Sequence, residues 1–164
     1  MRNVVLARID DRLIHGQVVT AWLKKTDGNL IVIPDDGVAK DVFMQRVLKA
    51  AAPKGVDLRV MTVADGAKFL LEESAPNEKV VILAKYPATY VSLIEAGCKF
   101  DEIVLGGMVN NPKRKPFIKQ CACTDEEAAD MEKIVDAGIH LYFQLVPGQT
   151  VIECAGPIKT RLGK

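Results

Sequence analysis

The sequence holds few cysteines and histidines, the side chains that most often bind zinc, and none in a zinc-binding spacing. Among its 164 residues there are four cysteines and two histidines, and the cysteines form no C-x-x-C pair. Zinc sites need such pairs or closely spaced histidines. We therefore expect no metal and no other cofactor. The cysteines, Cys98, Cys121, Cys123 and Cys154, are expected to be reduced and at least partly buried.

Long apolar runs and an excess of one charge are also missing. No apolar stretch approaches the roughly 20 residues of a membrane helix, and the amino terminus shows no signal-peptide pattern. Lys and Arg total 22 against 21 Asp and Glu, and this balance does not favour nucleic acid as a partner. We expect a cytoplasmic protein whose partners are proteins and small molecules, and which reaches a membrane only by docking on an integral subunit.

Short apolar runs alternate along the chain with amphipathic segments. Strands are expected at 3–7, 30–33, 56–63, 80–84, 102–105, 117–122, 139–145 and 149–155, and helices at about 16–27, 36–52, 64–73, 89–96 and 124–138. This alternation predicts an α/β fold: a single domain over residues 1–164 with a mainly parallel, doubly wound sheet of about six or seven strands and helices on both faces. Residues 159–164 are expected to form a frayed basic end.

His15 lies between the first expected strand and the first expected helix, which begins at about Gly16. The carboxyl ends of parallel strands are where open α/β sheets bind ligands. Free N–H groups at the start of a helix favour an anion, and Arg12 can hold phosphate oxygens with its forked guanidinium. The placement therefore predicts an exchange of phosphate at His15.

Histidine suits such an exchange because its unperturbed pKa of about 6.5 leaves a neutral, nucleophilic ring nitrogen at physiological pH. The second ring nitrogen can be held by a neighbouring acceptor, which fixes the tautomer. Asp10, Asp11 or a backbone carbonyl could each provide that acceptor. The residues alone leave this choice open.

A second segment of interest follows the strand at 102–105. The pair Gly106 and Gly107 would allow the backbone to approach a ligand closely, at the same sheet edge as His15. This position predicts a wall of the phosphate pocket. The three cations that come next, at positions 113–115, are expected to form a solvated basic tip.

The segment RIDDRLIHGQV, residues 8–18, resembles the IIB component of the mannose/fructose/sorbose class of the bacterial phosphoenolpyruvate-dependent sugar phosphotransferase system. Three further segments, LIVIPDD at 30–36, LGGM at 105–108 and TDEE at 124–127, look like that family in the same order. The resemblance implies that His15 receives a phosphoryl group on Nδ1 from a phosphohistidine of the IIA component. It then implies transfer to a sugar that enters through the IIC and IID membrane components.

The same resemblance gives Arg12 a role in binding the phosphoryl group and in meeting the partner. Around His15 we also expect phosphate-binding or partner-contacting roles for four further residues and the double glycine: Arg8, Asp10, Asp11, Gly16, Gly106 and Gly107.

Two other functions compete with this interpretation. A receiver-like regulatory domain could hold Mg²⁺ on Asp10 and Asp11 beside a phosphorylated aspartate of the third strand. The available aspartates there are poorly placed, because Asp57 comes early in that strand and Asp65 falls beyond its end. A noncatalytic module that binds a small ligand or a protein through the same loop would carry no covalent phosphate.

Overall fold

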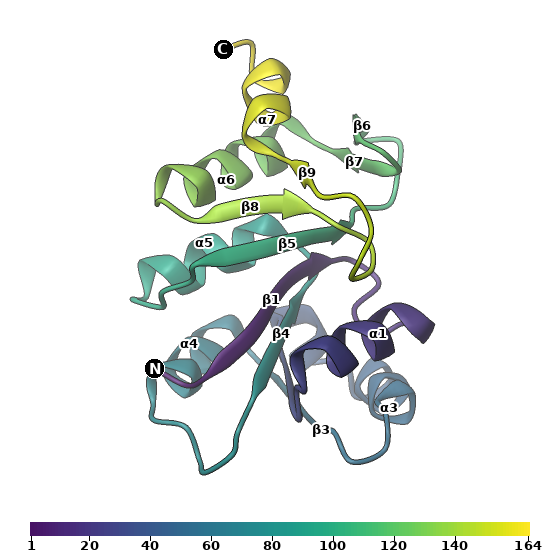
Figure 1. Cartoon of the computed structure of the whole chain (residues 1–164), viewed down its shortest axis with the longest axis vertical. Coiled ribbons are helices and arrows are strands. Elements are labelled where there is room, and N and C mark those ends of the chain that lie inside the picture. The colour runs from purple at the N-terminus through teal and green to yellow at the C-terminus, as the bar shows by residue number, and fades with distance from the viewer.

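A computed structural model describes all of residues 1–164 and contains one seven-stranded sheet with the strand order β3-β2-β4-β1-β5-β8-β9 (Figure 1). Its strands are β1 (Val4–Asp10), β2 (Leu30–Pro34), β3 (Asp57–Met61), β4 (Val80–Ala84), β5 (Glu102–Gly107), β8 (His140–Phe143) and β9 (Ile152–Glu153). Six strands run parallel, and only β9 runs antiparallel to its neighbour β8. The loops that follow β1, β5 and β8 therefore gather at one edge, on the right in Figure 1.

Helices cover both faces of this sheet. They are α1 (Gly16–Thr26), α2 (Asp36–Ala39), α3 (Val42–Ala51), α4 (Val63–Leu71), α5 (Pro87–Glu95), α6 (Asp125–Asp136) and α7 (Ala155–Arg161). One core cluster joins the sheet to α4, α5 and α6, and a second joins the opposite face to α1, α2 and α3. The predicted fold, a mainly parallel α/β sheet covered on both faces, is confirmed.

Side-chain caps decide where several helices begin. Thr124 and Glu127 form a reciprocal capping box at the start of α6. Asp41 accepts a hydrogen bond from the backbone of Met44 and so starts α3 as a separate helix. The single helix predicted for 36–52 is therefore wrong, and the Gln45 amide group donates to carbonyls at the end of α2, where the two helices part.

Two predictions in the last third of the chain are also wrong. The strand expected at 117–122 is a two-stranded antiparallel hairpin, β6 (Lys115–Ile118) and β7 (Cys121–Cys123), outside the main sheet. The chain reverses at Lys119, whose φ of 50° is left-handed. The first half of the expected frayed end, residues 159–161, belongs to α7. Ile158 of this helix is buried, and Arg161 donates hydrogen bonds to Asp125 and the Cys123 carbonyl.

The four cysteines are free and buried, as predicted. None of the helices has the length and the apolar character that crossing a bilayer requires.

Candidate functional site

His15 lies between β1 and α1, at the carboxyl edge of the sheet, and its side chain is 22% exposed. It is the N-cap residue of α1, and no side chain caps that helix. The first N–H groups of α1 are therefore free to meet an anion beside the imidazole. Gly16 has a left-handed φ of 44°, and open space surrounds the position where a side chain would begin.

The loop before His15 is fixed by burying two apolar side chains. Leu13 and Ile14 belong to the core cluster beneath α1. Leu13 takes a left-handed φ of 55°, which costs about 1 kcal/mol or more in a residue with a side chain. Burial of its side chain offsets this strain and holds the histidine in one place.

The carboxylate of Asp10 is the centre of the site. It is fully buried, and its Oδ2 lies 3.0 Å from Nε2 of His15. Arg12 donates to it from Nε and Nη2, each at 3.0 Å, and from its backbone N–H at 3.1 Å. Arg8 donates to Oδ2 from Nη2, at 3.4 Å. One carboxylate thus receives hydrogen bonds from two arginines and the histidine.

The charge state of Asp10 determines which nitrogen of His15 is free. Burial acts to raise the pKa of this carboxyl, but the hydrogen bonds from Arg12 and the charge of Arg8 outweigh it, and the pKa is lowered. An ionised carboxylate can only accept. Nε2 of His15 therefore carries the proton that is donated to Asp10, and Nδ1 keeps its lone pair. Of the three acceptors that the sequence left open, the structure selects Asp10.

Arg12 keeps part of its guanidinium available. Its side chain is 40% exposed, and Nη1 makes no hydrogen bond within the protein. Hydrogen bonding to Asp10 raises the pKa of Arg12, so the cation is permanent. The structure therefore brings Asp10, Arg12, His15 and Gly16 together as the sequence predicted.

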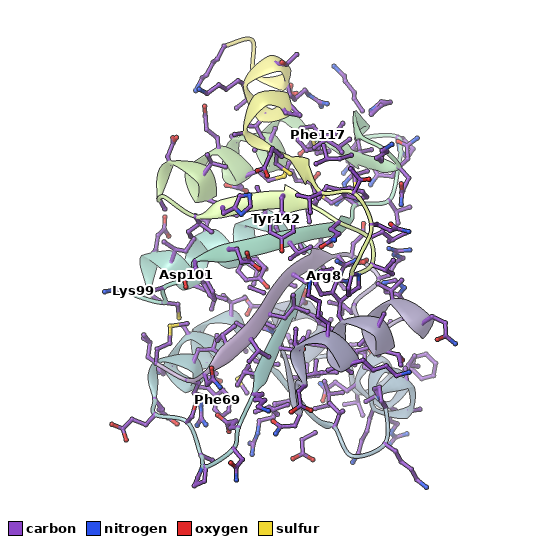
Figure 2. All side chains as sticks on the ribbon, viewed as in Figure 1. Arg8, Phe69, Lys99, Asp101, Phe117 and Tyr142 are labelled. Atoms are coloured by element: carbon purple, nitrogen blue, oxygen red, sulfur yellow. The ribbon has the colours of Figure 1, made fainter.

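Arg8 does not reach the surface with them. Its side chain is 1% exposed, and its Nη1 and Nη2 donate to the carbonyls of Gln144 and Leu145 at 2.9 and 3.0 Å. Figure 2 shows it at the carboxyl edge beside the loop that follows β8. The expectation that Arg8 itself contacts phosphate or a partner disagrees with this burial, and its contact within the site is with Asp10.

The double glycine at the end of β5 makes room for side chains of the site, where the sequence led us to expect a ligand. A Cβ on Gly106 would lie 2.0 Å from the guanidinium carbon of Arg8. A Cβ on Gly107 would lie 2.8 Å from both Arg12 Nη2 and Asp10 Oδ1. A side chain at Gly106 would displace Arg8, and a side chain at Gly107 would displace Arg12 or Asp10.

The sequence missed the role of Arg114, which lies in the expected solvated tip. Its side chain is only 5% exposed and donates to Asp11 at 2.7 Å, to the Val109 carbonyl at 2.8 Å and to both carboxylate oxygens of Glu127. Asp11 therefore faces Arg114 and does not contact His15. Nothing in the local pattern could reveal the pair with Asp11, because the two residues are 103 positions apart in the sequence. Lys113 and Lys115 are exposed as predicted.

The arrangement that a receiver domain needs is not present. Asp57 begins β3 at the amino end of an edge strand, and Asp65 lies in the first turn of α4. Asp10 and Asp11 are already paired with arginines, and the chain holds no group of three or more His, Cys, Asp or Glu side chains that could bind a metal ion.

Comparison with known proteins gives matches along nearly the whole chain. The family model described as PTS system sorbose subfamily IIB component matches residues 4–160. The chain is 32% identical over 147 residues to the PTS system fructose-specific EIIB component of Bacillus subtilis, covering 90% of each. It is 36% identical over 137 residues to the mannose-specific EIIAB component of Escherichia coli, covering 83% of this chain and 42% of that one.

Solved structures agree with the sequence matches. The IIBSor domain of the sorbose permease from Klebsiella pneumoniae superposes with a TM-score of 0.89 at 27% identity, covering 96% of this chain and 97% of that one. The N-acetylgalactosamine-specific IIB component 1 of Escherichia coli superposes with a TM-score of 0.87 at 29% identity, covering 92% and 99%.

Proposed function

The chain belongs to the sorbose subfamily of phosphotransferase-system IIB components, and from this membership we propose that it carries a phosphoryl group on His15 between a IIA component and a sugar. The sugar enters through the IIC and IID membrane components. The protein works in the cytoplasm and docks on those components. The observation that carries the proposal is the hydrogen bond from His15 Nε2 to the buried Asp10, which leaves Nδ1 as the nucleophile.

In the first step, the lone pair of Nδ1 attacks the phosphorus of a phosphohistidine on IIA. The new N–P bond forms as the bond to the donor imidazole breaks, and the donor nitrogen recovers its electron pair. Positive charge develops on the ring of His15, and the ionised Asp10 stabilises it through Nε2–H. The step needs no external base, because Nδ1 is not protonated in this tautomer.

Two groups at the surface of the site suit the transferred phosphoryl group. Nη1 of Arg12 is free, and the uncapped start of α1 offers backbone N–H groups. Gly16 carries no side chain, and open space surrounds the position where one would begin. These donors stabilise the negative charge on the equatorial oxygens of the phosphoryl group. Such electrostatic stabilisation is the main contribution that a protein makes to phosphoryl transfer.

In the second step, a sugar hydroxyl oxygen attacks the phosphorus. The N–P bond breaks, its electron pair returns to Nδ1, and the hydroxyl proton passes to water. The neutral imidazole that remains is again hydrogen-bonded to Asp10. The cycle therefore returns the site to its starting state with no change in the protein.

Apolar side chains at the carboxyl edge support docking of protein partners there. Five of the eight exposed large apolar residues follow the carboxyl ends of β2, β4, β5 and β8, namely Val42, Phe43, Tyr86, Val109 and Val151. Exposed apolar patches around a polar site are typical of protein contacts. IIA and the membrane components must each reach His15, so they meet this edge in turn.

The proposal is tested by labelling. The protein is incubated with radioactive phosphoenolpyruvate, enzyme I, HPr and the matching IIA component, and the stability of the bound label is measured. We expect one phosphoryl group per chain, labile in acid and stable in alkali, as for phosphohistidine. A label sensitive to alkali and hydroxylamine would identify an acyl phosphate and support a receiver-like function. Absence of label would support a noncatalytic binding module.

Arg12→Ala should slow the transfer without unfolding the protein. Removing one donor that stabilises developing charge costs about 10²- to 10³-fold in rate. The stability loss should be about 1 kcal/mol, because the side chain is partly exposed and Asp10 keeps its contact with Arg8. Rapid-quench labelling and thermal melting measure the two effects.

The matched control is Arg46→Ala, which removes an exposed arginine of α3 that makes no ion pair. Its transfer rate should stay within about twofold of wild type. A collapsed melting transition in Arg12→Ala, or equal rates for the two variants, would contradict the assigned role.

A further inference from the structure

Asp10 has two arginine partners, and their side chains differ in how far they are exposed to solvent. Arg12 is partly exposed and donates to Asp10 from the exposed side of the site. Arg8 is fully buried within β1. Both can neutralise the carboxylate, but only one of them is accessible to a phosphoryl group. The site therefore contains one arginine that can change partners and one that cannot.

The contacts of Arg8 hold its two terminal nitrogens, whereas the buried Nε has no hydrogen-bond partner. Two carbonyls in the loop that follows β8 accept from its terminal nitrogens. One of them, that of Leu145, also accepts from the indole N–H of Trp22 at 3.0 Å. The guanidinium carbon lies 5.4 Å from the centre of the Trp22 ring. Gly106 fills the remaining side, where a Cβ could not fit. A cation so enclosed cannot follow a ligand.

Phosphorylation of His15 changes which negative groups the two arginines can pair with. A phosphoryl group on Nδ1 of His15 brings negative charge to the exposed side of the site and competes with Asp10 for Arg12. If Arg12 were the only counter-ion, its departure would leave Asp10 as an isolated buried charge, which is strongly unfavourable. Nε2 of His15 needs that charge most in this state, because the phosphorylated ring depends on one acceptor.

We infer that Arg8 is a positioning residue: a fixed counter-ion that keeps Asp10 charged and hydrogen-bonded to His15 when Arg12 turns toward the phosphoryl group. This inference rests on the proposed function. It assigns no contact between Arg8 and phosphate or partner. Arg12 contacts the phosphoryl group, and Arg8 stays paired with the carboxylate that orients the imidazole.

The first test compares Arg8→Met with Arg8→Lys in the transfer assay with phosphorylated IIA. The two side chains have similar length, but only lysine restores a cation beside Asp10. We expect methionine to lower kcat by about 10- to 100-fold, as is typical when a residue that orients a catalytic ligand is lost, with KM for IIA within about twofold. Lysine should recover most of the loss in kcat.

Equal kcat for the methionine and lysine variants would reduce Arg8 to a packing role, and a rise in KM alone would make it a partner contact. Either result overturns the inference. Arg2→Met is the matched control, because Arg2 is also largely buried, packs on Phe69 and pairs with Glu78, far from the site at the start of β1. It should lower stability and leave kcat unchanged.

A second test does not require Arg8 variants to fold. In unphosphorylated Arg12→Ala, Arg8 is the only cation left on Asp10, and ¹⁵N NMR of the imidazole reports the tautomer of His15. We expect the Nε2–H tautomer to stay dominant, as in wild type. A mixture of tautomers would show that Arg8 is not sufficient. The tautomer measurement needs no phosphoryl transfer, so it tests Arg8 even if the wild-type protein accepts no phosphate from IIA. Failure of the wild-type protein to accept phosphate would refute the proposed function alone.

Discussion

Replacing His15 by alanine is expected to remove phosphoryl acceptance from IIA, with the rate falling by more than about 10⁴-fold, because the covalent nucleophile is lost. The fold should remain. The side chain is 22% exposed, and its hydrogen bond joins it to Asp10, which keeps both arginine partners. The expected loss in the free energy of unfolding is about 1 kcal/mol. Labelling and chemical denaturation measure the two effects.

The chain supplies its own control, because it has only two histidines. His140 lies at the start of β8, at the opposite edge of the sheet from His15, where it is exposed and paired with Glu153. His140→Ala should be labelled like wild type. Labelling of His15→Ala at the wild-type level, or loss of labelling in His140→Ala, would contradict the assignment.

Asp10→Asn is expected to have the second-largest effect on transfer. An amide can donate as well as accept, so it no longer forces the proton onto Nε2 of His15, and it carries no charge to stabilise the ring. Loss of the correct tautomer lowers rates by about 10³- to 10⁴-fold in comparable sites. The variant also leaves Arg8 buried without its counter-ion, which should cost about 3 kcal/mol of stability. Rapid-quench kinetics and denaturation curves provide the measurements.

Asp10 also makes stability depend on pH. Because its pKa is lowered in the folded protein, the carboxylate stabilises the fold above the pKa of the unfolded chain, about 3.9, and this contribution is lost as the pH falls below that value. As the pH falls, the free energy of unfolding of Asp10→Asn should therefore decrease less steeply than that of wild type.

Asp35→Asn is the control for the effect of Asp10→Asn on transfer, since Asp35 is another largely buried aspartate that caps α2 and does not contact His15. Transfer by Asp35→Asn at the rate of Asp10→Asn would contradict a specific role for Asp10.

Much of the fold could be predicted because buried parallel strands leave a clear mark in the sequence. The run at 80–84 is apolar at every position, and the structure places β4 on the same residues. The hairpin of β6 and β7 could not be predicted in this way. Its reversal depends on Lys119 taking a left-handed conformation that its residue type does not favour.

The site was predictable where it depends on neighbours in sequence and not where it depends on distant loops. Arg12 and His15 follow from the spacing of charged residues after a strand. The choice between Asp10 and Asp11 depends on where β1 ends: the strand extends to Asp10, which then shares a face with Arg8. The burial of Arg8 and Arg114 depends on carbonyls and carboxylates more than a dozen residues away, which no local pattern encodes.

The position of the phosphoryl group on the imidazole tests the central claim most directly. The protein is labelled with ¹⁵N-histidine, phosphorylated through IIA, and examined by ¹⁵N and ³¹P NMR. The hydrogen bond between Nε2 and Asp10 predicts a phosphorus bonded to Nδ1 of His15, with Nε2 still protonated. Phosphorus on Nε2, or on any residue other than His15, would contradict the account.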